Sequence, residues 1–326
     1  MATQPTPVNI NNFKTAESDF YFSRSVKDGA FGKFVHNREM TPLDKQIVVR
    51  MNRDTVYSNA VFDLDTAPVT ITLPDSGKRF MSMQIISEDH YAIDVVYAPC
   101  SYTVTKDKVG TRYVMAAIRT LANPTDPADM KAVHALQDAI RVEQASIGKF
   151  EIPDWDQTSQ NKAREALEEL GSLGADSKGS FGKKSEVDPV KHLIGTAVGW
   201  GGNPEVAASY VIATPKQNDG KTVYSLTVKD VPVDGFWSVT VYNAKGFFEK
   251  NDRDAYSINN IIGKPNADGS FTVQFGVCEK STPNCLPIIP GWNYAIRMYR
   301  PRPEILNGIW KFPEAVPVGN IKKEAA

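Results

Sequence analysis

Arginine, aspartate and tyrosine side chains fall close together at residues 53–57, where they could bind and polarise a small carbonyl compound. Arg53 and Asp54 directly precede a strand-forming stretch that carries Tyr57 on one face. A guanidinium can hold a carboxylate through two parallel hydrogen bonds, and a phenol can donate to a developing oxyanion. We therefore predict that Arg53 holds the substrate and that Tyr57 stabilises the oxyanion. The alternative is a structural ion pair between Arg53 and Asp54 at a strand end.

A second set of reactive residue types occurs at Asp89-His90-Tyr91. Histidine next to a carboxylate is the usual combination for a general base and the group that orients it. Successive residues of a strand point to opposite faces, so Asp89 can orient His90 only if the backbone turns there. We predict His90 as a candidate general base oriented by a third group, with a surface histidine as the alternative.

Metal and nucleophile motifs are scarce. The four histidines are His36, His90, His134 and His192, and none has His-x-His or His-Glu-x-x-His spacing. A metal enzyme that uses His90 and His192 therefore stays a secondary alternative, and no cofactor is expected. The Gly-x-Ser-x-Gly motif of the α/β-hydrolases and the phosphate-binding P-loop are both absent from the sequence.

Aromatic and asparagine side chains recur in the second half of the chain. They suit a cleft for a small polar ligand or a sugar, although such aromatics more often belong to a core. The predicted substrate-binding residues are Asp54, Trp237, Tyr242, Asn243, Tyr256 and Asn259.

The elements that must position these residues are mainly strands. Alternating apolar and polar residues from 54 to 120, joined by short turns, are typical of antiparallel strands, and the pattern resumes from 224 to 299. Apolar residues at helical spacing lie between these two regions. The predicted helices are 125–140, 157–170 and 190–198, with terminal ones at 11–27 and 302–308.

These patterns predict a mainly β fold made of two antiparallel β-sandwich or jelly-roll units, with a helical connector and short terminal helices. Glycine and serine are frequent from 171 to 185, which is typical of a flexible linker. The predicted organisation is an N-terminal β unit at 1–120, a connector at 121–186 and a C-terminal β-sandwich at 187–326.

Composition excludes several classes of function. Among 326 residues, 37 Lys and Arg balance 38 Asp and Glu to a net charge of -1, which does not favour nucleic acid. No segment reaches the roughly 20 apolar residues of a membrane span. The N-terminus lacks the regions of a signal peptide, so we expect either a cytoplasmic protein or a mature exported form with an added Met. The spacing of Cys278 and Cys285 leaves open a disulfide or two unpaired thiols.

Longer motifs resemble two bacterial families. Met51–Ser58, Arg79–Gln84 and Glu88–Tyr91 resemble domain-of-unknown-function family 1254. Gly199–Gly202, Asp234–Ser238, Tyr256–Asn259 and Pro290–Tyr294, among other strings, resemble family 1214. The resemblance implies two β units in proteins that are often exported and sometimes labelled carboxylesterases. It also favours a disulfide between Cys278 and Cys285, and with it a periplasmic or secreted location.

Two functions follow as expectations. The first is a cofactor-independent hydrolase of a small ester or related carbonyl compound, acting in a cleft between the β units through Arg53, Tyr57 and His90. The alternative is a non-catalytic, exported small-ligand-binding or surface protein. In either case the expected partner is a small molecule, and a homo-oligomer is left open.

Overall fold

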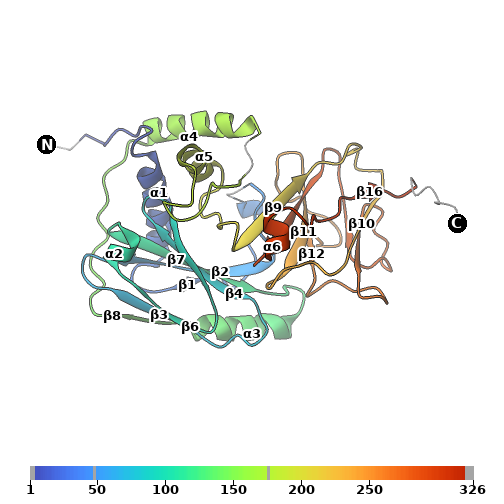
Figure 1. Cartoon of the computed structure of the whole chain (residues 1–326), viewed down its shortest axis with the longest axis horizontal. Coiled ribbons are helices and arrows are strands. Elements are labelled where there is room, and N and C mark those ends of the chain that lie inside the picture. The colour runs from blue at the N-terminus through green and yellow to red at the C-terminus, as the bar shows by residue number, and fades with distance from the viewer. Residues whose placement is uncertain (1–3, 47–48, 175–176, 320–326) are drawn as a thin grey trace. The chain divides into compact units, whose positions relative to one another are not determined.

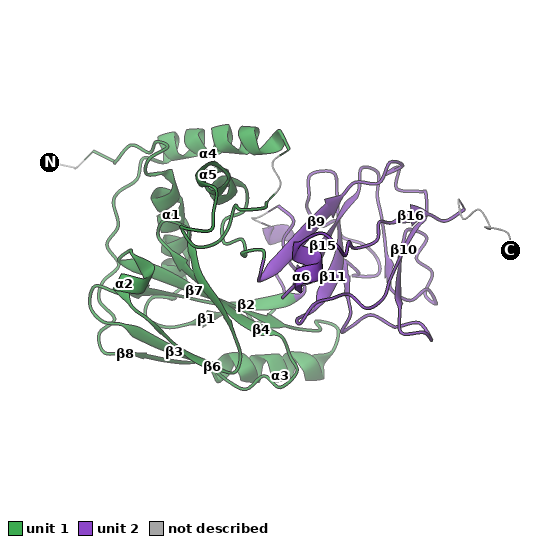
Figure 2. Ribbon diagram, viewed as in Figure 1, with its two compact units in different colours: residues 1–39, 55–205 green, residues 40–54, 206–326 purple. Residues whose placement is uncertain are grey.

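A computed structural model describes residues 4–46, 49–174 and 177–319 (Figure 1). The chain divides into two compact units (Figure 2). Unit 1 comprises Met1–Glu39 and Thr55–Glu205, and unit 2 comprises Met40–Asp54 and Val206–Ala326. Strands outweigh helices, and nearly every strand pair is antiparallel, so the predicted mainly β fold is confirmed. None of the helices among the described residues is long and apolar enough to cross a membrane.

Three of the helices begin at an aspartate that caps them. The side chains of Asp126, Asp156 and Asp188 each accept backbone N–H groups from the first turn that follows. Proline at the first turn, at Pro127 and Pro189, fixes a helical backbone and removes a donor that would lack a partner. The α-helices are α1 Phe13–Lys27, α2 Lys106–Val109, α3 Pro127–Asp138, α4 Gln157–Ser172, α5 Pro189–Val198 and α6 Pro303–Leu306, and Leu43–Lys45 forms a 3₁₀ turn.

Unit 1 is built on two sheets. The larger has the strand order β1-β2-β7-β4-β5, and the smaller has the order β6-β3-β8. Phe62, Ile71, Met83 and Ile118 belong to the apolar layer between them. The strands are β1 Val35–His36, β2 Thr55–Asp63, β3 Val69–Leu73, β4 Met81–Ser87, β5 Ala92–Tyr97, β6 Cys100–Val104, β7 Tyr113–Leu121 and β8 Arg141–Gln144.

The second face of the larger sheet is also covered. Phe22 of α1 packs against Val61 and Met115, which alternate with the residues that face the smaller sheet. Burial on both faces explains why every residue of β7 is buried. Helix α1 in turn packs with α4 and α5, so this helical layer completes unit 1 (Figure 1).

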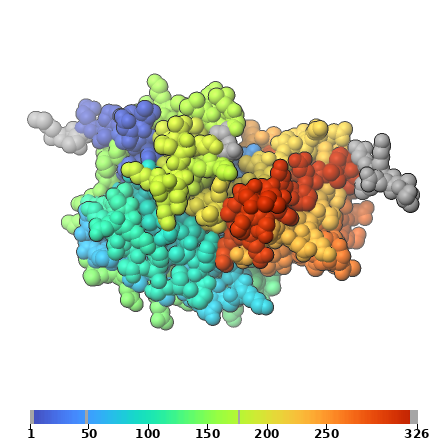
Figure 3. Space-filling view, viewed as in Figure 1, coloured from blue at the N-terminus to red at the C-terminus, as the bar shows by residue number. Residues whose placement is uncertain are grey.

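The glycine- and serine-rich stretch is partly packed. Residues 175–176 lie outside the described part of the chain. Ser180 is buried, its carbonyl oxygen lies 2.9 Å from Nδ1 of His192, and the amide of Ala92 donates to the carbonyl of Gly182. On the face shown in Figure 3, this yellow-green segment adjoins the teal surface formed near residue 100. Residues 177–182 therefore make specific contacts with the rest of unit 1, which a flexible linker would not.

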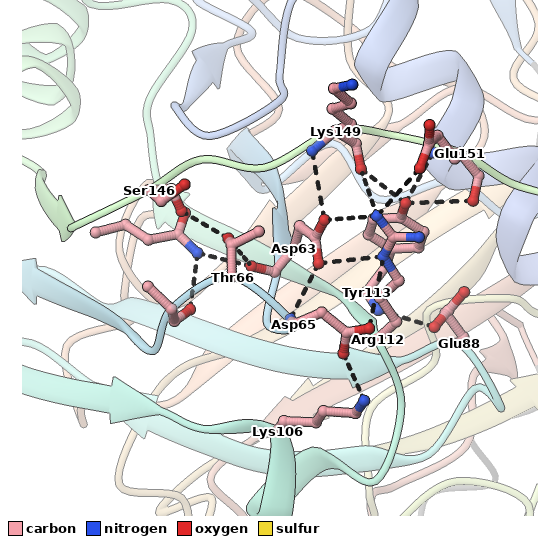
Figure 4. Close-up of polar contacts among 12 residues, drawn as sticks. Asp63, Asp65, Thr66, Glu88, Lys106, Arg112, Tyr113, Ser146, Lys149 and Glu151 are labelled. Atoms are coloured by element: carbon pink, nitrogen blue, oxygen red, sulfur yellow. Dashed lines mark hydrogen bonds and ion pairs between the residues drawn. The ribbon is translucent and has the colours of Figure 1, made fainter.

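A buried carboxylate fixes the loops at the end of β2 (Figure 4). Asp63 is fully buried and accepts two hydrogen bonds from the guanidinium of Arg112, at 3.2 and 2.9 Å. Burial alone would raise the pKa of Asp63, but Arg112 and the amides of Asp65 and Lys149 outweigh it and lower the pKa. Gly148 makes the close approach possible, because a Cβ there would lie 2.5 Å from the Asp63 carboxylate.

Unit 2 is a sandwich of two four-stranded sheets, with the strand orders β12-β11-β15-β9 and β14-β13-β10-β16. Trp237, Leu226 and Phe275 belong to the apolar core formed between them. The strands are β9 Ala208–Ala213, β10 Tyr224–Val228, β11 Trp237–Tyr242, β12 Ser257–Asn259, β13 Phe271–Phe275, β14 Cys285–Leu286, β15 Asn293–Tyr299 and β16 Val316–Pro317.

A disulfide joins Cys278 to Cys285, as the resemblance implied. It closes the loop between β13 and β14, which pair in parallel through Gln274 and Phe275. The bond therefore fixes a connection that the short two-residue strand β14 could hold only weakly. Cys100 is a free thiol.

Candidate functional site

The segment that carries Arg53 and Asp54 belongs to unit 2, although it is far in sequence from the rest of that unit. Gln46 exchanges two hydrogen bonds with the backbone of Phe248, at 3.0 and 2.6 Å. The amide of Arg50 donates to the carbonyl of Gly246, and the phenol of Tyr242 donates to the carbonyl of Met51 at 2.7 Å. The segment 40–54 is thus anchored on the β12-β11-β15-β9 sheet.

Arg53 lies against aromatic rings. Its guanidinium is 4.9 Å from the ring centre of Tyr256 and 5.7 Å from that of Phe248, and Nη1 donates to the carbonyl of Thr41 at 2.8 Å. Burial lowers the pKa of Arg53, partly offset by Asp254 and Tyr256. No ion pair joins Arg53 to Asp54, both of which the structure describes. The ion-pair alternative is therefore wrong, and Arg53 keeps donors in its fork for another partner.

Asp54 is buried with one carboxylate oxygen satisfied. Its exposed fraction is 1%, and Oδ1 accepts hydrogen bonds from the Ser257 hydroxyl at 2.8 Å and the Asn259 amide at 3.3 Å. Among the residues that the structure describes, no group donates to Oδ2. The fully buried hydroxyl of Ser238 also lacks a partner there, and Ser238 is directly opposite Asn259 in the sheet. Oδ2 of Asp54 and the hydroxyl of Ser238 are therefore two buried polar groups without hydrogen-bond partners, and both lie near Asn259.

Arg297 supplies the positive charge on the same face. Ser238 lies opposite Arg297 on β15, and the buried guanidinium donates to Thr240 at 3.0 Å and to the Tyr242 phenol at 2.6 Å. Burial opposes the charge of Arg297, but Tyr242 and Asp54 help to outweigh that effect and raise its pKa. Burial also raises the pKa of Tyr242, which therefore stays a neutral phenol at pH 7. We call this set the Asp54 cluster; it comprises Asp54, Ser238, Thr240, Tyr242, Ser257, Asn259 and Arg297.

The structure gathers four of the six predicted binding residues around this cluster. Asp54, Tyr242 and Asn259 belong to it, and Tyr256 contacts the neighbouring Arg53. Trp237 does not, because it lies on the opposite face of β11, in the core between the sheets. Asn243 does not either: its side chain accepts the amides of Lys245 and Phe247 and so closes the turn after β11.

Sequence reasoning missed Ser238, Ser257 and Arg297. The alternation of β11 holds a signal, because Ser238 and Thr240 share the face opposite Trp237. Both are nevertheless buried, and nothing local shows that a polar strand face will be covered. Arg297 stands within a strand whose other residues are mostly apolar, which is the clearest sequence sign of a buried charge.

Tyr57 belongs to unit 1, on β2, and so is assigned to a different unit from Arg53. The guanidinium of Arg119 lies 5.5 Å from its ring centre. Arg119 is itself buried and donates to the Gln84 side chain and to the carbonyl of Gly201. The strand β2 thus places Tyr57 beside a buried arginine that holds the glycine-rich turn after α5.

His90 is buried in unit 1, so the surface alternative is wrong. The backbone does turn at this residue, with a φ of 63°. Nε2 accepts the amide of Gly201 at 2.8 Å, which requires the proton on Nδ1, and Nδ1 then donates to the Thr196 hydroxyl at 2.9 Å. Burial, with His192 and Lys14, holds the pKa of His90 well below its usual value. Both ring nitrogens of His90 therefore have hydrogen-bond partners, and its role as a general base stays a prediction.

His192 is fixed in a similar way. Its ring stacks on the rings of His90 and Tyr91. Nδ1 faces the carbonyl of Ser180 at 2.9 Å, and Nε2 faces the carbonyl of Asp89 at 3.1 Å. Because backbone groups and Thr196 occupy the ring nitrogens of both histidines, His90 and His192 do not present a metal site. No group of three His, Cys, Asp or Glu residues in the described ranges is arranged to hold an ion.

Comparison with known proteins supports the two-part organisation. Residues 31–99 match a family model described as a protein of unknown function (DUF1254), and residues 207–303 match another described as a protein of unknown function (DUF1214). The predicted resemblance is thereby confirmed for both halves. A search of curated proteins gave no match.

Two solved structures share the fold. The crystal structure of the VPA0106 protein from Vibrio parahaemolyticus is similar over 95% of this chain and 97% of its own, with a TM-score of 0.71 and 18% identity. An uncharacterised protein from Burkholderia cenocepacia is similar over 94% of this chain and 88% of its own, with a TM-score of 0.55 and 12% identity. At these identities the likeness concerns the fold alone.

Proposed function

We propose that the chain is an exported binding protein and that unit 2 holds a small polyhydroxylated ligand at the Asp54 cluster without transforming it. The observation that carries the proposal is the pair of unsatisfied buried groups, Oδ2 of Asp54 and the hydroxyl of Ser238. A buried polar group without a partner costs about 1–3 kcal/mol, and a charged one costs more. A ligand with neighbouring hydroxyl groups would satisfy both groups at once.

The surroundings of these two groups suit such a ligand. Asn259 and Ser257 hold the other oxygen of Asp54, so its carboxylate is already oriented before a ligand arrives. Arg297 brings a positive charge to the same face of the sheet, and the nearby Asp54 helps to raise the pKa of Arg297. Next to the cluster, the guanidinium of Arg53 lies over the ring of Tyr256 and has N–H donors that a ligand can use. Aromatic surface beside fixed polar groups is the usual lining of a site for small polar molecules.

Binding accounts for these residues better than hydrolysis does. A hydrolase needs a base or an activated nucleophile. The predicted base, His90, has no free ring nitrogen, and the hydroxyl of Ser257 donates to Asp54 without a histidine between them. Asp54 and Ser257 can orient a ligand as they stand, whereas all four histidines of the chain belong to unit 1.

The disulfide supports export. Disulfides persist in oxidising compartments such as the periplasm and the extracellular space, and they are rare in the cytosol. The bond between Cys278 and Cys285 therefore favours a periplasmic or secreted protein. A binding protein in that location would meet small solutes before they reach the cell interior.

Calorimetric titration with mannitol, glucose and glucosamine tests the proposal. The wild type should bind at least one of them saturably, and Asp54→Asn and Ser238→Ala should each weaken that binding at least tenfold. Asn at position 54 can still accept from Ser257, so the fold should persist, which circular dichroism checks. Asp234→Asn is the matched control, because that carboxylate is exposed and pairs with Arg302.

Three results would overturn the proposal. Saturable binding that survives both substitutions would place the ligand elsewhere. Absence of binding in calorimetry, together with a bare protein in native mass spectrometry, would mean that the cluster holds only buried water. Turnover of p-nitrophenyl acetate that is lost in Asp54→Asn would make unit 2 an enzyme instead.

A further inference from the structure

Unit 1 contains a cavity of about 680 Å³ that the Asp54 cluster does not involve. Three parts of the chain line it: the start of β5 with the turn before it, the end of α2, and the segment after Gly182. The yellow-green and teal surfaces of Figure 3 meet where these parts adjoin. The lining residues are Asp89, Tyr91, Ile93, Asp94, Lys108, Val109, Gly110, Lys183, Lys184 and Ser185.

Three lysines make one region of the cavity positive. Lys108 and Lys183 approach opposite oxygens of Asp94, at 3.4 and 3.6 Å. Asp94 also accepts a hydrogen bond from the phenol of Tyr102. Asp94 is thus fully engaged and serves to hold the two ammonium groups in place. Each ammonium has three donors, so both lysines keep donors for a ligand, as does Lys184 beside them.

Asp89 gives the lining a negative group of its own. The hydroxyl of Thr15 donates to its Oδ1 at 2.9 Å, which orients the carboxylate, and no contact within the described ranges occupies Oδ2. The carbonyl of Asp89 faces His192, which fixes the backbone behind it. Asp89 therefore presents a pre-oriented acceptor to the cavity.

Tyr91 adds a rigid donor next to Asp89. Its ring stacks on His192, with ring centres 4.5 Å apart, and the ammonium of Lys14 lies 4.7 Å from its centre. Lys14 also donates to the phenol oxygen at 3.1 Å, which leaves the phenol proton for another acceptor. Lys14 is thus committed to Tyr91 rather than to Asp89.

The lining therefore offers groups of both signs that are not fully satisfied internally. Its charges are those of three lysines and two aspartates, and one aspartate is already shared by two of the lysines. Ile93 and Val109 supply apolar surface to the same lining. A molecule that complements all three features carries an acidic group, a basic group and an aliphatic segment.

We propose that this cavity binds a small zwitterion of the amino-acid class, with its carboxylate on Lys183 and Lys184 and its ammonium on Asp89. The aliphatic part of the ligand packs on Ile93 and Val109. All the lining residues belong to unit 1, so this proposal can be tested independently of the one for the Asp54 cluster in unit 2.

Three probes with the same number of carbon atoms separate the contributions of the two charges. 6-Aminohexanoate has both charges, hexanoate has only the carboxylate, and hexylamine has only the ammonium. Binding is measured by calorimetry on the full chain. We expect 6-aminohexanoate to bind at least tenfold more tightly than either single-charge probe, because each removal deletes one charge-assisted hydrogen bond.

Substitutions locate the site. Asp89→Asn should reduce the affinity for 6-aminohexanoate to that for hexanoate, while Asn can still accept from Thr15. The double variant Lys183→Met and Lys184→Met should reduce the affinity for 6-aminohexanoate to the affinity for hexylamine. Lys311→Met, an exposed lysine of unit 2, is the control and should change nothing.

The alternative outcomes are distinct. Equal binding of hexanoate and 6-aminohexanoate, unaffected by Asp89→Asn, would show a simple anion site and overturn the proposal. Saturable binding that survives the lysine variant would place the ligand outside the cavity. Absence of saturable binding of all three probes would also overturn it, and none of these results bears on the Asp54 cluster.

Discussion

Replacing Glu88 by Gln should remove most of the pH dependence of the stability of unit 1. Glu88 lies beside Asp19, which is 1% exposed and accepts the indole N–H of Trp155 at 2.8 Å. Glu88 accepts the amide of Tyr113 at 2.8 Å (Figure 4). Burial, with a smaller effect of Asp89, raises the pKa of Asp19 to about 6. Burial, followed by the charges of Asp19 and Asp89, raises the pKa of Glu88 to about 7. Two carboxyl groups in contact favour one shared proton.

The magnitude follows from the shift of Glu88. A rise from 4.5 to about 7 corresponds to about 3 kcal/mol, at about 1.4 kcal/mol per pKa unit. Because the folded-state pKa is raised, this stability is fully present below pH 4.5, the unfolded value, and is lost as the pH rises through 7. The wild type should therefore be less stable at pH 8 than at pH 5. Asp19 acts in the same direction, but the two titrations are coupled and their effects do not add.

Gln at position 88 imitates the protonated carboxyl group. Its oxygen can accept from Tyr113 and its amide can donate to Asp19, at any pH. We expect Glu88→Gln to match the wild type at pH 5 and to exceed its free energy of unfolding at pH 8 by up to about 3 kcal/mol. Urea unfolding at both pH values, followed by fluorescence, measures the difference.

The matched control is Glu165→Gln, an exposed position of α4, which should follow the wild type at both pH values. The reasoning is refuted if the wild type and Glu88→Gln lose stability in parallel between pH 5 and pH 8. A variant that is weaker at both pH values would show that Glu88 is ionised in the folded protein and that its charge is stabilising.

Three further outcomes are expected. Gly148→Ala should lower the melting temperature by several degrees, since its φ is +69° and the new Cβ would displace the Asp63 carboxylate; differential scanning calorimetry checks this. Replacing Cys278 and Cys285 by Ser should cost about 2 kcal/mol in urea unfolding, as expected for so short a loop, and addition of reductant should then affect only the wild type. The ring protons of His90 should show no titration by NMR between pH 5 and 8, because burial keeps its pKa well below the usual value; a midpoint near 6.5 would contradict the occupied ring nitrogens.

The sequence predicted the elements well where the signal is local. Asp126, Asp156 and Asp188 mark three helix starts, because a capping side chain reaches only two or three residues along the chain. Strand alternation at Val69–Leu73 likewise appears as alternating burial, since one face meets the core. β7 shows no such alternation in its burial, because both of its faces are covered.

The candidate site could be predicted only in part. The sequence indicates Asp54 and Asn259 as polar residues of interest, but their contact joins positions 205 residues apart. His90 shows the same limit, because its partners Thr196 and Gly201 are more than a hundred residues away. Residue types reveal what chemistry is available, whereas the contacts that occupy a ring nitrogen or leave a carboxylate oxygen unsatisfied come from long-range packing.

The assignment of residues 40–54 to unit 2 determines the order in which the molecule can be completed during synthesis. This segment leaves the ribosome early, but its anchors at Tyr242, Gly246 and Phe248 follow about two hundred residues later. Until those residues are synthesised, segment 40–54 interrupts the chain of unit 1 and has no sheet to bind. A fragment that ends at residue 205 would keep this segment without its sheet. No single cut of the chain therefore yields the two units as separate pieces.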